Sequence, residues 1–353
     1  MKTTHEMEWM NNLRAIATLG VILIHVSSPV VSMAYGYQMN YWWVGNIIDS
    51  VVRFAVPAFL MLSGASLLNK DYELKDFYVK RIKRVLIPFL FWMLAYWVFF
   101  WFTDHPEKHP QNDLGSIFNW AIGVFTERGI SKHFWFVYML LFLYAVTPFL
   151  GRWIRKQKTK TISYILLGWI FYNLMQTAGV IDTKHLPLLV NKVYGYILYS
   201  GYMVLGYYLC KFDISSRKFS TLSYIVLIAT ILFTAIGTYY ISKHAKDLTL
   251  KFYGNLGLNT IAQSIAIFIL MKKSTVKNKI LVWIRNIVSQ YSFGIYLVHI
   301  MVIGVFYLND FFWTIAHPAL SVPVVAMATL VVSILIIYIL RKIPVVKYVS
   351  GYK

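Results

Sequence analysis

The feature that most constrains this chain is a series of apolar stretches of about 20 residues, each long enough to cross the hydrocarbon core of a bilayer. Hydrophobic residues make up 58% of the 353 residues, and charged residues only 14%. We expect an all-α membrane protein, a polytopic bundle of about ten transmembrane helices, which forms one domain over residues 1–353 with no appended soluble domain. The candidate spans are residues 13–33, 45–68, 86–103, 134–151, 161–181, 195–210, 220–241, 254–271, 292–308 and 319–340.

The distribution of basic residues predicts the orientation of these spans. A net charge of +20 would favour nucleic acid as a partner for a soluble chain, but here the basic residues lie in the connections between spans. Lys and Arg number 25 in the N-terminal segment, the even-numbered connections and the C-terminal segment, against 8 in the odd-numbered connections. By the positive-inside rule both termini are expected to be cytoplasmic, and no nucleic-acid partner is expected.

The first span carries an arginine and a histidine, Arg14 and His25, in the run "LRAIATLGVILIH". An ionisable group inside a span costs roughly 2.5 to 3.5 kcal/mol on insertion scales, which makes each one a functional hypothesis. Eleven residues make three helical turns plus about 20°, so the two side chains share a face about 16 Å apart along the axis. Arg14 then lies at the cytoplasmic edge and His25 near mid-membrane. The structural alternatives are a snorkelling anchor for Arg14 and an interhelical hydrogen bond for His25.

The second span contains Asp49 and Arg53 four residues apart, on one face of a helix. Their depth is similar to that of His25, and a structural ion pair is the competing interpretation. The same span continues as "VPAFLMLSGASLL", in which Pro57 and the pair Ser63 and Gly64 could kink the helix or permit a close approach by another segment.

The ninth span adds Tyr296 and His299, one turn apart in "SFGIYLVHIMV" and again near mid-depth. The first, second and ninth spans thus bring His or Arg to one level in the membrane. Such residues mark a substrate path or a reactive centre.

The second inner connection ends in the basic run "KRIKRVLIP", with Lys80, Arg81, Lys83 and Arg84. A run of this kind is most often a topological signal or a contact with lipid head groups. The spacing of Arg81 and Arg84 nevertheless sets them side by side on a helix, as suits forked recognition of phosphate.

The longest connection, about residues 104–133, is expected outside the cytoplasm, where it could form a lid or an acceptor-binding loop. Its histidines, His105, His109 and His133, show no metal-ligand spacing and are expected to be solvated. The sequence contains none of the motifs for nucleotide hydrolysis, dinucleotide binding, zinc proteolysis or soluble-type serine hydrolysis.

The chain resembles the acyltransferase 3 family of integral membrane O-acyltransferases over nearly its whole length. The similar segments are "NNLRAIATLGVILIH" with Arg14 and His25, "RFAVPAFLMLSG" at 53–64, the pair Arg81 and Arg84, "HFWFVYMLLFLYAVTPFL" at 133–150 and "YSFGIYLVH" at 291–299. Within the family it looks most like stand-alone members that O-acetylate surface polysaccharides, of the enterobacterial common antigen O-acetyltransferase type. It departs at Asn11, where the family commonly has Asp, and at Ala65, where an aromatic is common. Without that carboxylate, Arg14 is expected to be less firmly held.

The resemblance implies an acyl-CoA donor, most simply acetyl-CoA, and a hydroxyl acceptor on a cell-surface glycan or its lipid-linked precursor. His25 is expected to act as general base, because an unperturbed imidazole pKa of about 6.5 suits proton abstraction at neutral pH, or to form an acyl-histidine; the sequence leaves both open. The rise between Arg14 and His25 is comparable with an extended pantetheine arm. The expected roles are catalysis by His25 and Arg14; oxyanion stabilisation or orientation by Arg53, Tyr296 and His299; phosphate binding by Arg81, Arg84 and Lys83; and acceptor binding by Trp135, His133 and Asp49.

Two other classes of function fit parts of the pattern. A transporter or flippase would explain His25 and Arg53 but offers less reason for paired arginines at the cytosolic surface. A scaffold subunit of a glycan-assembly complex would require the intramembrane charges to be incidental. The expected location is the bacterial cytoplasmic membrane, in contact with lipid; no metal is expected, and a homodimer is left open.

Overall fold

The computed structural model describes residues 4–103, 113–116, 118–119, 132–183, 185–212, 214, 216–344 and 346–352, and every regular element in these ranges is helical. The α-helices are α1 (Thr4–Ala34), α2 (Met39–Val52), α3 (Ala55–Leu67), α4 (Leu74–Thr103), α6 (Trp135–Arg155), α7 (Thr159–Thr177), α8 (Leu188–Lys211), α9 (Arg217–Ala245), α10 (Leu258–Lys272), α11 (Lys279–Leu308) and α12 (Pro318–Lys342). Short 3-10 turns are η2 (Lys132–Phe134), η3 (Lys251–Tyr253), η4 (Trp313–Ile315) and η5 (Val346–Tyr348).

Helices occupy all ten stretches that the sequence predicts to cross a membrane. By length and composition, the described residues form 8 helices able to span a bilayer, with α2 and α3 together making one span and η3 and α10 another. The two remaining stretches, α7 and α8, are helical but are not among those 8, because polar side chains, tyrosines and glycines dilute their apolar character. The all-α prediction is confirmed for the described residues, while the count of ten spans and the orientation stay predictions.

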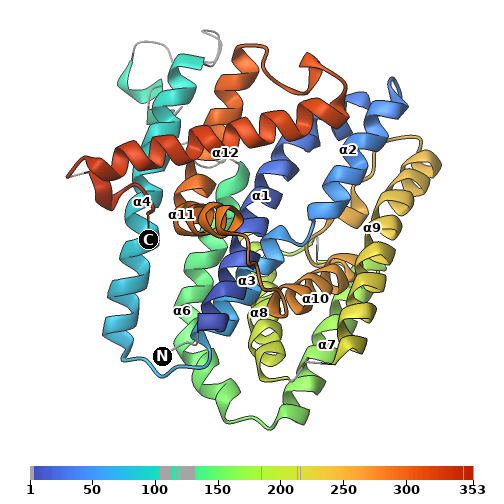
Figure 1. Ribbon diagram of the computed structural model, residues 1–353, viewed down its shortest axis with the longest axis vertical. Coiled ribbons are helices and arrows are strands. Elements are labelled where there is room, and N and C mark those ends of the chain that lie inside the picture. Colours follow the sequence, from blue (N-terminus) through green and yellow to red (C-terminus); the bar gives the residue numbers. More distant parts are fainter. Residues whose placement is uncertain are drawn as a thin grey trace.

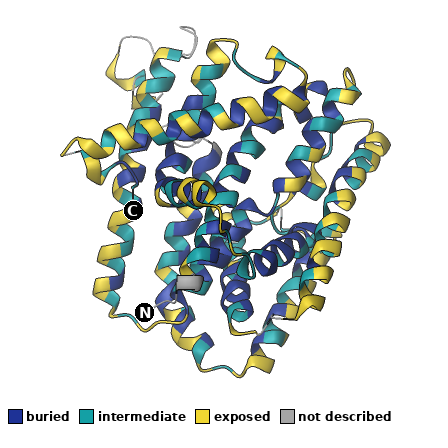
Figure 2. Ribbon diagram, viewed as in Figure 1, coloured by how far each residue is buried: buried dark blue, intermediate teal, exposed yellow. Residues whose placement is uncertain are grey.

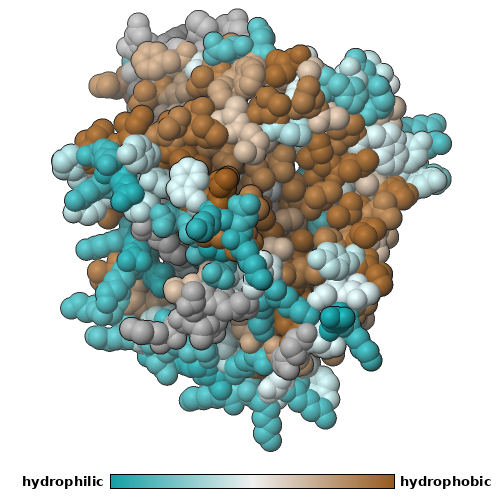
Figure 3. Space-filling model, in the orientation of Figure 1, coloured by the Kyte–Doolittle hydropathy of each residue, from teal (hydrophilic) through white to brown (hydrophobic). Residues whose placement is uncertain are grey.

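Helix α1 forms the centre of the bundle and packs against α2, α3, α10, α11 and α12 (Figure 1). Its N-terminal end, the α3–α4 connection and the α6–α7 connection lie at the same end of the molecule (Figure 1). Buried residues gather around α1, whereas α9 carries long exposed stretches (Figure 2); only 17% of its most apolar window is buried. Apolar side chains cover the upper part of the face seen in Figure 3, and hydrophilic side chains line its lower edge. An apolar outer surface of this kind is compatible with lipid and not with water.

The predicted kink in the second span is confirmed, and it falls at Arg53. Helix α2 ends at Val52 and α3 begins at Ala55, with Arg53 and Phe54 forming the turn between them. Pro57 has no N–H to donate to the carbonyl of Arg53, four residues earlier, and its ring crowds that carbonyl, so the helix breaks there. The break exposes one turn of backbone to side-chain partners, and this turn carries Arg53.

Small residues bring α3 and α8 into close contact. A Cβ atom at Gly64 would overlap the backbone of Met203, and one at Gly206 would overlap the backbone of Met61. The sequence-based expectation of a close approach at Gly64 is therefore confirmed, with α8 as the approaching segment.

Candidate active site

Three histidines from distant parts of the chain meet inside the bundle. His25 lies on α1, His133 on η2 and His299 on α11. The ring centroids of His25 and His299 are 5.2 Å apart, those of His133 and His299 5.2 Å, and those of His25 and His133 6.3 Å. His133 is 4% exposed and His299 is fully buried. The structure thus assembles a cluster of imidazoles at the level where the sequence predicts buried polar groups.

Backbone carbonyls fix the orientation of His299. Its Nδ1 atom lies 2.7 Å from the carbonyl oxygen of Tyr296 and 3.1 Å from that of Ile295. A carbonyl oxygen only accepts, so Nδ1 carries the proton of the neutral ring and Nε2 keeps the lone pair. Nε2 has no hydrogen-bond partner among the described residues. His299 therefore presents an acceptor nitrogen to the interior of the cluster.

Tyrosines surround the cluster and hold His133. The Tyr296 hydroxyl donates to the backbone carbonyl of His133, and the Tyr296 ring centroid lies 5.3 Å from that of the imidazole. On another side, the Tyr96 ring lies 5.5 Å from His133, and its hydroxyl accepts a hydrogen bond from the backbone N–H of Met301 at 2.9 Å. Contacts among residues of α4, η2 and α11 therefore hold the His133 side of the cluster in place.

The expectation that His133 is a solvated loop histidine is wrong. Its ring is buried and lies 4.3 Å from the ring of Phe134, in a 3-10 turn that enters the bundle just before α6. The physical reason is the run of aromatic residues that follows it, since burying "FWF" carries the preceding turn inward. His105 and His109 lie outside the described residues.

A narrow crevice runs from the histidine cluster toward the N-terminal ends of α1 and α11. Its empty volume is about 180 Å³, counted with the open space at its mouth, and the whole crevice has room for about one water molecule. It ends at His299 on one side and reaches Thr18 on the other; Thr18 lies one helical turn after Arg14. The residues that line it are Thr18, Val21, Ile22, Phe59, Ser292, Ile295, Tyr296 and His299.

Arg14 lies one helical turn before Thr18, just beyond the end of the crevice that Thr18 lines. Its Nη1 atom donates to Asn11 Oδ1 at 3.1 Å and to Ser289 Oγ at 3.0 Å, and Ser289 Oγ donates to Asn11 Oδ1 at 2.9 Å. Asn11 thus contacts Arg14 through its amide oxygen, and a serine of α11 supplies a second contact, while the weaker hold expected from the loss of a carboxylate stays a prediction. What Asn11 does not supply is a negative charge.

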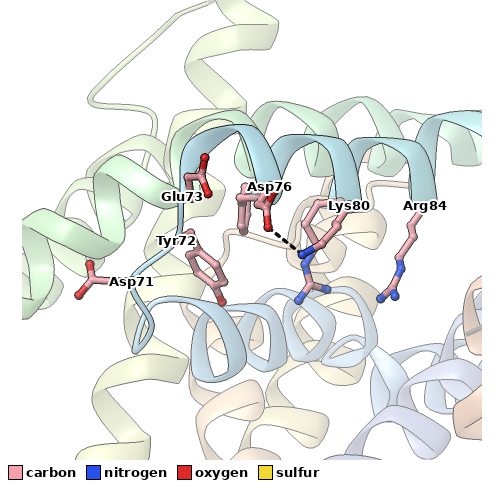
Figure 4. Close-up of a pocket in the computed structure, with 8 residues that line it drawn as sticks. Asp71, Tyr72, Glu73, Asp76, Lys80 and Arg84 are labelled. Carbon is pink, nitrogen blue, oxygen red and sulfur yellow. Dashed lines mark hydrogen bonds and ion pairs between the residues drawn. The ribbon is translucent and has the colours of Figure 1, made fainter.

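The arginine pair of α4 lines an open pocket beside the α3–α4 connection (Figure 4). The lining residues are Asp71, Tyr72, Glu73, Asp76, Phe77, Lys80, Arg81 and Arg84. Two of the carboxylates already have cationic partners. Asp76 bonds Lys80 at 2.9 Å, as Figure 4 shows, and Asp71 is paired with Arg155, which is not among the lining residues. Neither Arg81 nor Arg84 forms an ion pair or a side-chain hydrogen bond in the part of the chain described. Lys83 is exposed and does not line the pocket, whereas Lys80 does.

Tyr144 connects the α4 pocket with Arg14. The phenol of this α6 residue lies within electrostatic range of Arg81, Arg14 and Arg84. Residues from α1 and α4 therefore converge on one side chain of α6, and the same helix begins beside His133.

Asp49 and Arg53 form an ion pair in which the carboxylate is buried and the guanidinium is 12% exposed. Asp49 is 1% exposed and pairs with Arg53 through its carboxylate. The guanidinium of Arg53 also lies 4.2 Å from the ring centroid of Tyr253 and donates to its backbone carbonyl at 3.3 Å. Arg53 is within electrostatic range of His25.

Trp135, at the start of α6, packs against Tyr199 of α8 with ring centroids 5.5 Å apart.

Removing the Asp49 carboxylate is expected to destabilise the protein strongly. Asp49→Ala leaves the Arg53 charge buried without a partner, which costs about 3–5 kcal/mol, and thermal unfolding in detergent should occur at a clearly lower temperature. The paired change Asp49→Leu with Arg53→Met removes both charges and should recover most of that loss. A double variant as unstable as the single one would contradict this account.

The described residues contain no group of three His, Cys, Asp or Glu side chains arranged to hold a metal ion. The three clustered histidines are therefore assigned no metal, and the absence of a metal requirement stays a prediction.

Comparison with known proteins identifies the family. A family model described as an acyltransferase domain matches residues 7–340, which is nearly the whole chain and includes every residue of the site. No curated protein and no solved structure matches the chain. With its apolar helices and its buried histidine cluster, this chain belongs to the acyltransferase 3 family and is an integral membrane acyltransferase.

Proposed function

We propose that this protein is an O-acyltransferase that moves an acyl group, most simply acetyl, from cytosolic acyl-CoA to a hydroxyl of a cell-surface glycan or its lipid-linked precursor. Within the family it would belong with the stand-alone polysaccharide O-acetyltransferases of the enterobacterial common antigen type, in the bacterial cytoplasmic membrane with both termini inside. The observation that carries the proposal is the contact of His25 with His133 and His299 at the end of a crevice that approaches Arg14.

Donor binding is proposed at the cytoplasmic end. Arg81 and Arg84 lack carboxylate partners in the described chain, and they and Arg14 all lie within electrostatic range of Tyr144. Forked guanidinium groups suit the phosphates of a nucleotide carrier. Lys83, exposed on the same helix, would add long-range attraction without lining the pocket.

The flexible arm of the donor would then follow the crevice between α1, α3 and α11. Arg14 and His25 are about 16 Å apart along the helix axis, a span comparable with an extended pantetheine arm. The crevice is narrow, so its side chains have to rotate apart to admit the arm. The mostly apolar lining suits a thioester better than the charged nucleotide, which would remain at the cytoplasmic surface.

The chemistry proposed at the cluster is acyl transfer with His25 as general base. His25 takes the proton of the acceptor hydroxyl as that oxygen attacks the thioester carbonyl, and the tetrahedral oxyanion then collapses with loss of the CoA thiolate, which takes up the proton. Arg53, Tyr296 and His299 are the proposed groups that stabilise the oxyanion or orient His25. An acyl-histidine intermediate is the covalent version of the same site.

The acceptor is proposed to approach from the side of η2 and α6. His133 is part of the cluster, and Trp135 offers an aromatic surface suited to a sugar ring. Asp49 is bound to Arg53, so its contribution to acceptor binding would be made through that arginine.

The direct test uses purified protein, radiolabelled acetyl-CoA and candidate glycans. Transfer of label to glycan, or slow release of CoA in its absence, is the expected result. Transport of a lipid-linked glycan across a vesicle membrane without any use of acetyl-CoA would instead support a transporter, which neither the family match nor the described residues favour.

Loss of the α4 arginines is expected to weaken donor use. The double variant Arg81→Ala with Arg84→Ala should raise the KM for acetyl-CoA by about 10- to 100-fold with a much smaller change in kcat, because charge-assisted hydrogen bonds to phosphate are lost while the distant reacting atoms are unaffected. Lys75→Ala, an exposed cation of the same helix outside the pocket, is the matched control. An unchanged KM in the double variant would remove these arginines from the donor site.

A further inference from the structure

A second buried arginine, Arg285, lies at the cytoplasmic end of α11. It is only 8% exposed. Its Nη1 atom donates to Asn12 Oδ1 at 3.0 Å and its Nε atom to Asn286 Oδ1 at 3.1 Å. A guanidinium has five N–H donors, and the other three of Arg285 have no partner in the described residues. Both acceptors are neutral amides, so its positive charge is unpaired.

Arg285 and Arg14 belong to the same contact between α1 and α11. Arg14 bonds Asn11 and Ser289, while Arg285 bonds Asn12, the next residue of α1. Because Arg285 precedes Ser289 by one helical turn, it lies about 6 Å closer to the N-terminal end of α11. The two guanidinium groups therefore lie at successive positions along the α1–α11 interface, and Arg285 is the farther of the two from the histidine cluster.

Electrostatics argue that this interface is built to receive an anion. None of the ion pairs in the described residues involves Arg14 or Arg285. Arg285 is buried and Arg14 is half-buried, and a charge held largely out of water with only amide and hydroxyl partners is unfavourable until a counter-charge arrives. A purely structural link between α1 and α11 would need only hydrogen bonds. A neutral side chain could form them without the free-energy cost of burying an unpaired charge. Several guanidinium donors left over on each arginine match the oxygens of phosphate.

We propose that Arg285 binds the phosphate group of the donor that lies farthest from the thioester, one helical turn outside Arg14. The inference rests on the proposed function, because it takes the donor to be acyl-CoA. With Arg14 and the α4 arginines around Tyr144 taking the diphosphate next to the arm, Arg285 takes the 3′-phosphate of the ribose. Arg285 thereby makes the protein select CoA over the same carrier without that phosphate.

Calorimetric titration of purified protein with CoA and with dephospho-CoA tests this without turnover. Wild-type protein is expected to bind CoA more tightly. Arg285→Gln should weaken CoA binding by about 10- to 100-fold while changing dephospho-CoA binding by about twofold or less, so that the preference disappears. Arg217→Gln, an exposed cation at the start of α9, is the control and should keep the preference. Arg285→Lys keeps the charge but loses the fork, and should narrow the preference without abolishing it.

The outcomes separate the possible errors. Equal weakening of both ligands in Arg285→Gln would show a structural role, and unchanged binding of both would remove Arg285 from the site; either result overturns the inference. If Arg285→Gln does not fold, Arg285→Lys decides, because an unaltered preference there would contradict forked recognition. Wild-type protein that binds CoA but transfers no acyl group would refute the proposed function and leave Arg285 under test, whereas wild-type protein that binds no CoA would refute both.

Discussion

Replacement of His25 by alanine is expected to lower the rate of acyl transfer by about 10²- to 10⁴-fold, the usual contribution of a positioned general base. The imidazole lies next to the rings of His299 and His133, which places a basic nitrogen at the proposed reaction site. His25→Gln keeps a polar side chain of similar size and should lose as much activity. The measurement is initial rate of label transfer from acetyl-CoA, with the quantity of folded protein matched by size-exclusion chromatography.

Ser27→Ala provides a control on the same helix. Ser27 is fully buried two residues after His25, and its hydroxyl bonds only the backbone carbonyl of Ile24 among the described residues. At 200° around the helix it faces away from the cluster, so its activity should be unchanged. Transfer by His25→Ala at the rate of wild-type protein would eliminate the proposed base. Trapped acyl-enzyme in wild-type protein, absent from the variant, would instead favour the acyl-histidine route.

Gly64→Ala is expected to destabilise the protein by at least about 3 kcal/mol and to reduce the yield of folded material sharply. The added Cβ would overlap the backbone of Met203, which cannot rotate away as a side chain can, so α3 and α8 must separate. The contact between these helices supports α3, and α3 supplies Phe59 to the crevice. Thermal unfolding followed by fluorescence-detected chromatography in detergent measures the loss.

Gly168→Ala is the same chemical change, but it is expected to leave stability unchanged or to increase it. Gly168 lies in the interior of α7, and a Cβ there meets nothing within 4 Å. Higher helix propensity should make this variant as stable as the wild type or more stable, by up to about 1 kcal/mol. Equal destabilisation by Gly64→Ala and Gly168→Ala would contradict this account, because it would mean that the close approach of α8 does not restrict which side chains are tolerated at position 64.

The arginines that face the interior of the bundle differ in their hydrogen-bond and ion-pair partners. Arg53 has a carboxylate partner in Asp49, so it is neutralised within the fold. Arg14 and Arg285 have amide and hydroxyl partners and remain charged. In the described residues, the cation between α2 and α3 is therefore paired with a carboxylate, whereas the two cations toward the N-terminal ends of α1 and α11 have only neutral hydrogen-bond partners.

Local sequence patterns predicted much of the architecture. Hydropathy gave helices at all ten stretches, because a segment in lipid must satisfy its backbone internally. Pro57 suggested a kink in the second span, and the structure places it at Arg53, where the missing donor acts four residues earlier. Helical periodicity predicted that Arg14 and His25 share a face, and the crevice that starts at Thr18 and the ring contact of His25 are compatible with that. Each of these inferences depends on interactions within one helix or with the membrane.

The sequence alone determined the helical class, the possibility of a kink from Pro57 and the polar residues of α1, because each follows from local backbone chemistry or from the cost of charge in lipid. Tertiary structure alone decided that His133 joins His25 and His299, that Ser289 holds Arg14 across 275 positions of sequence, and that Arg285 lies beside Asn12. Those contacts join residues that are far apart in the sequence, and the number of residues between them does not predict how close they lie in the fold. They arise only when the packing of α1, α6 and α11 brings particular faces together, and no periodicity within one helix can specify which faces those are.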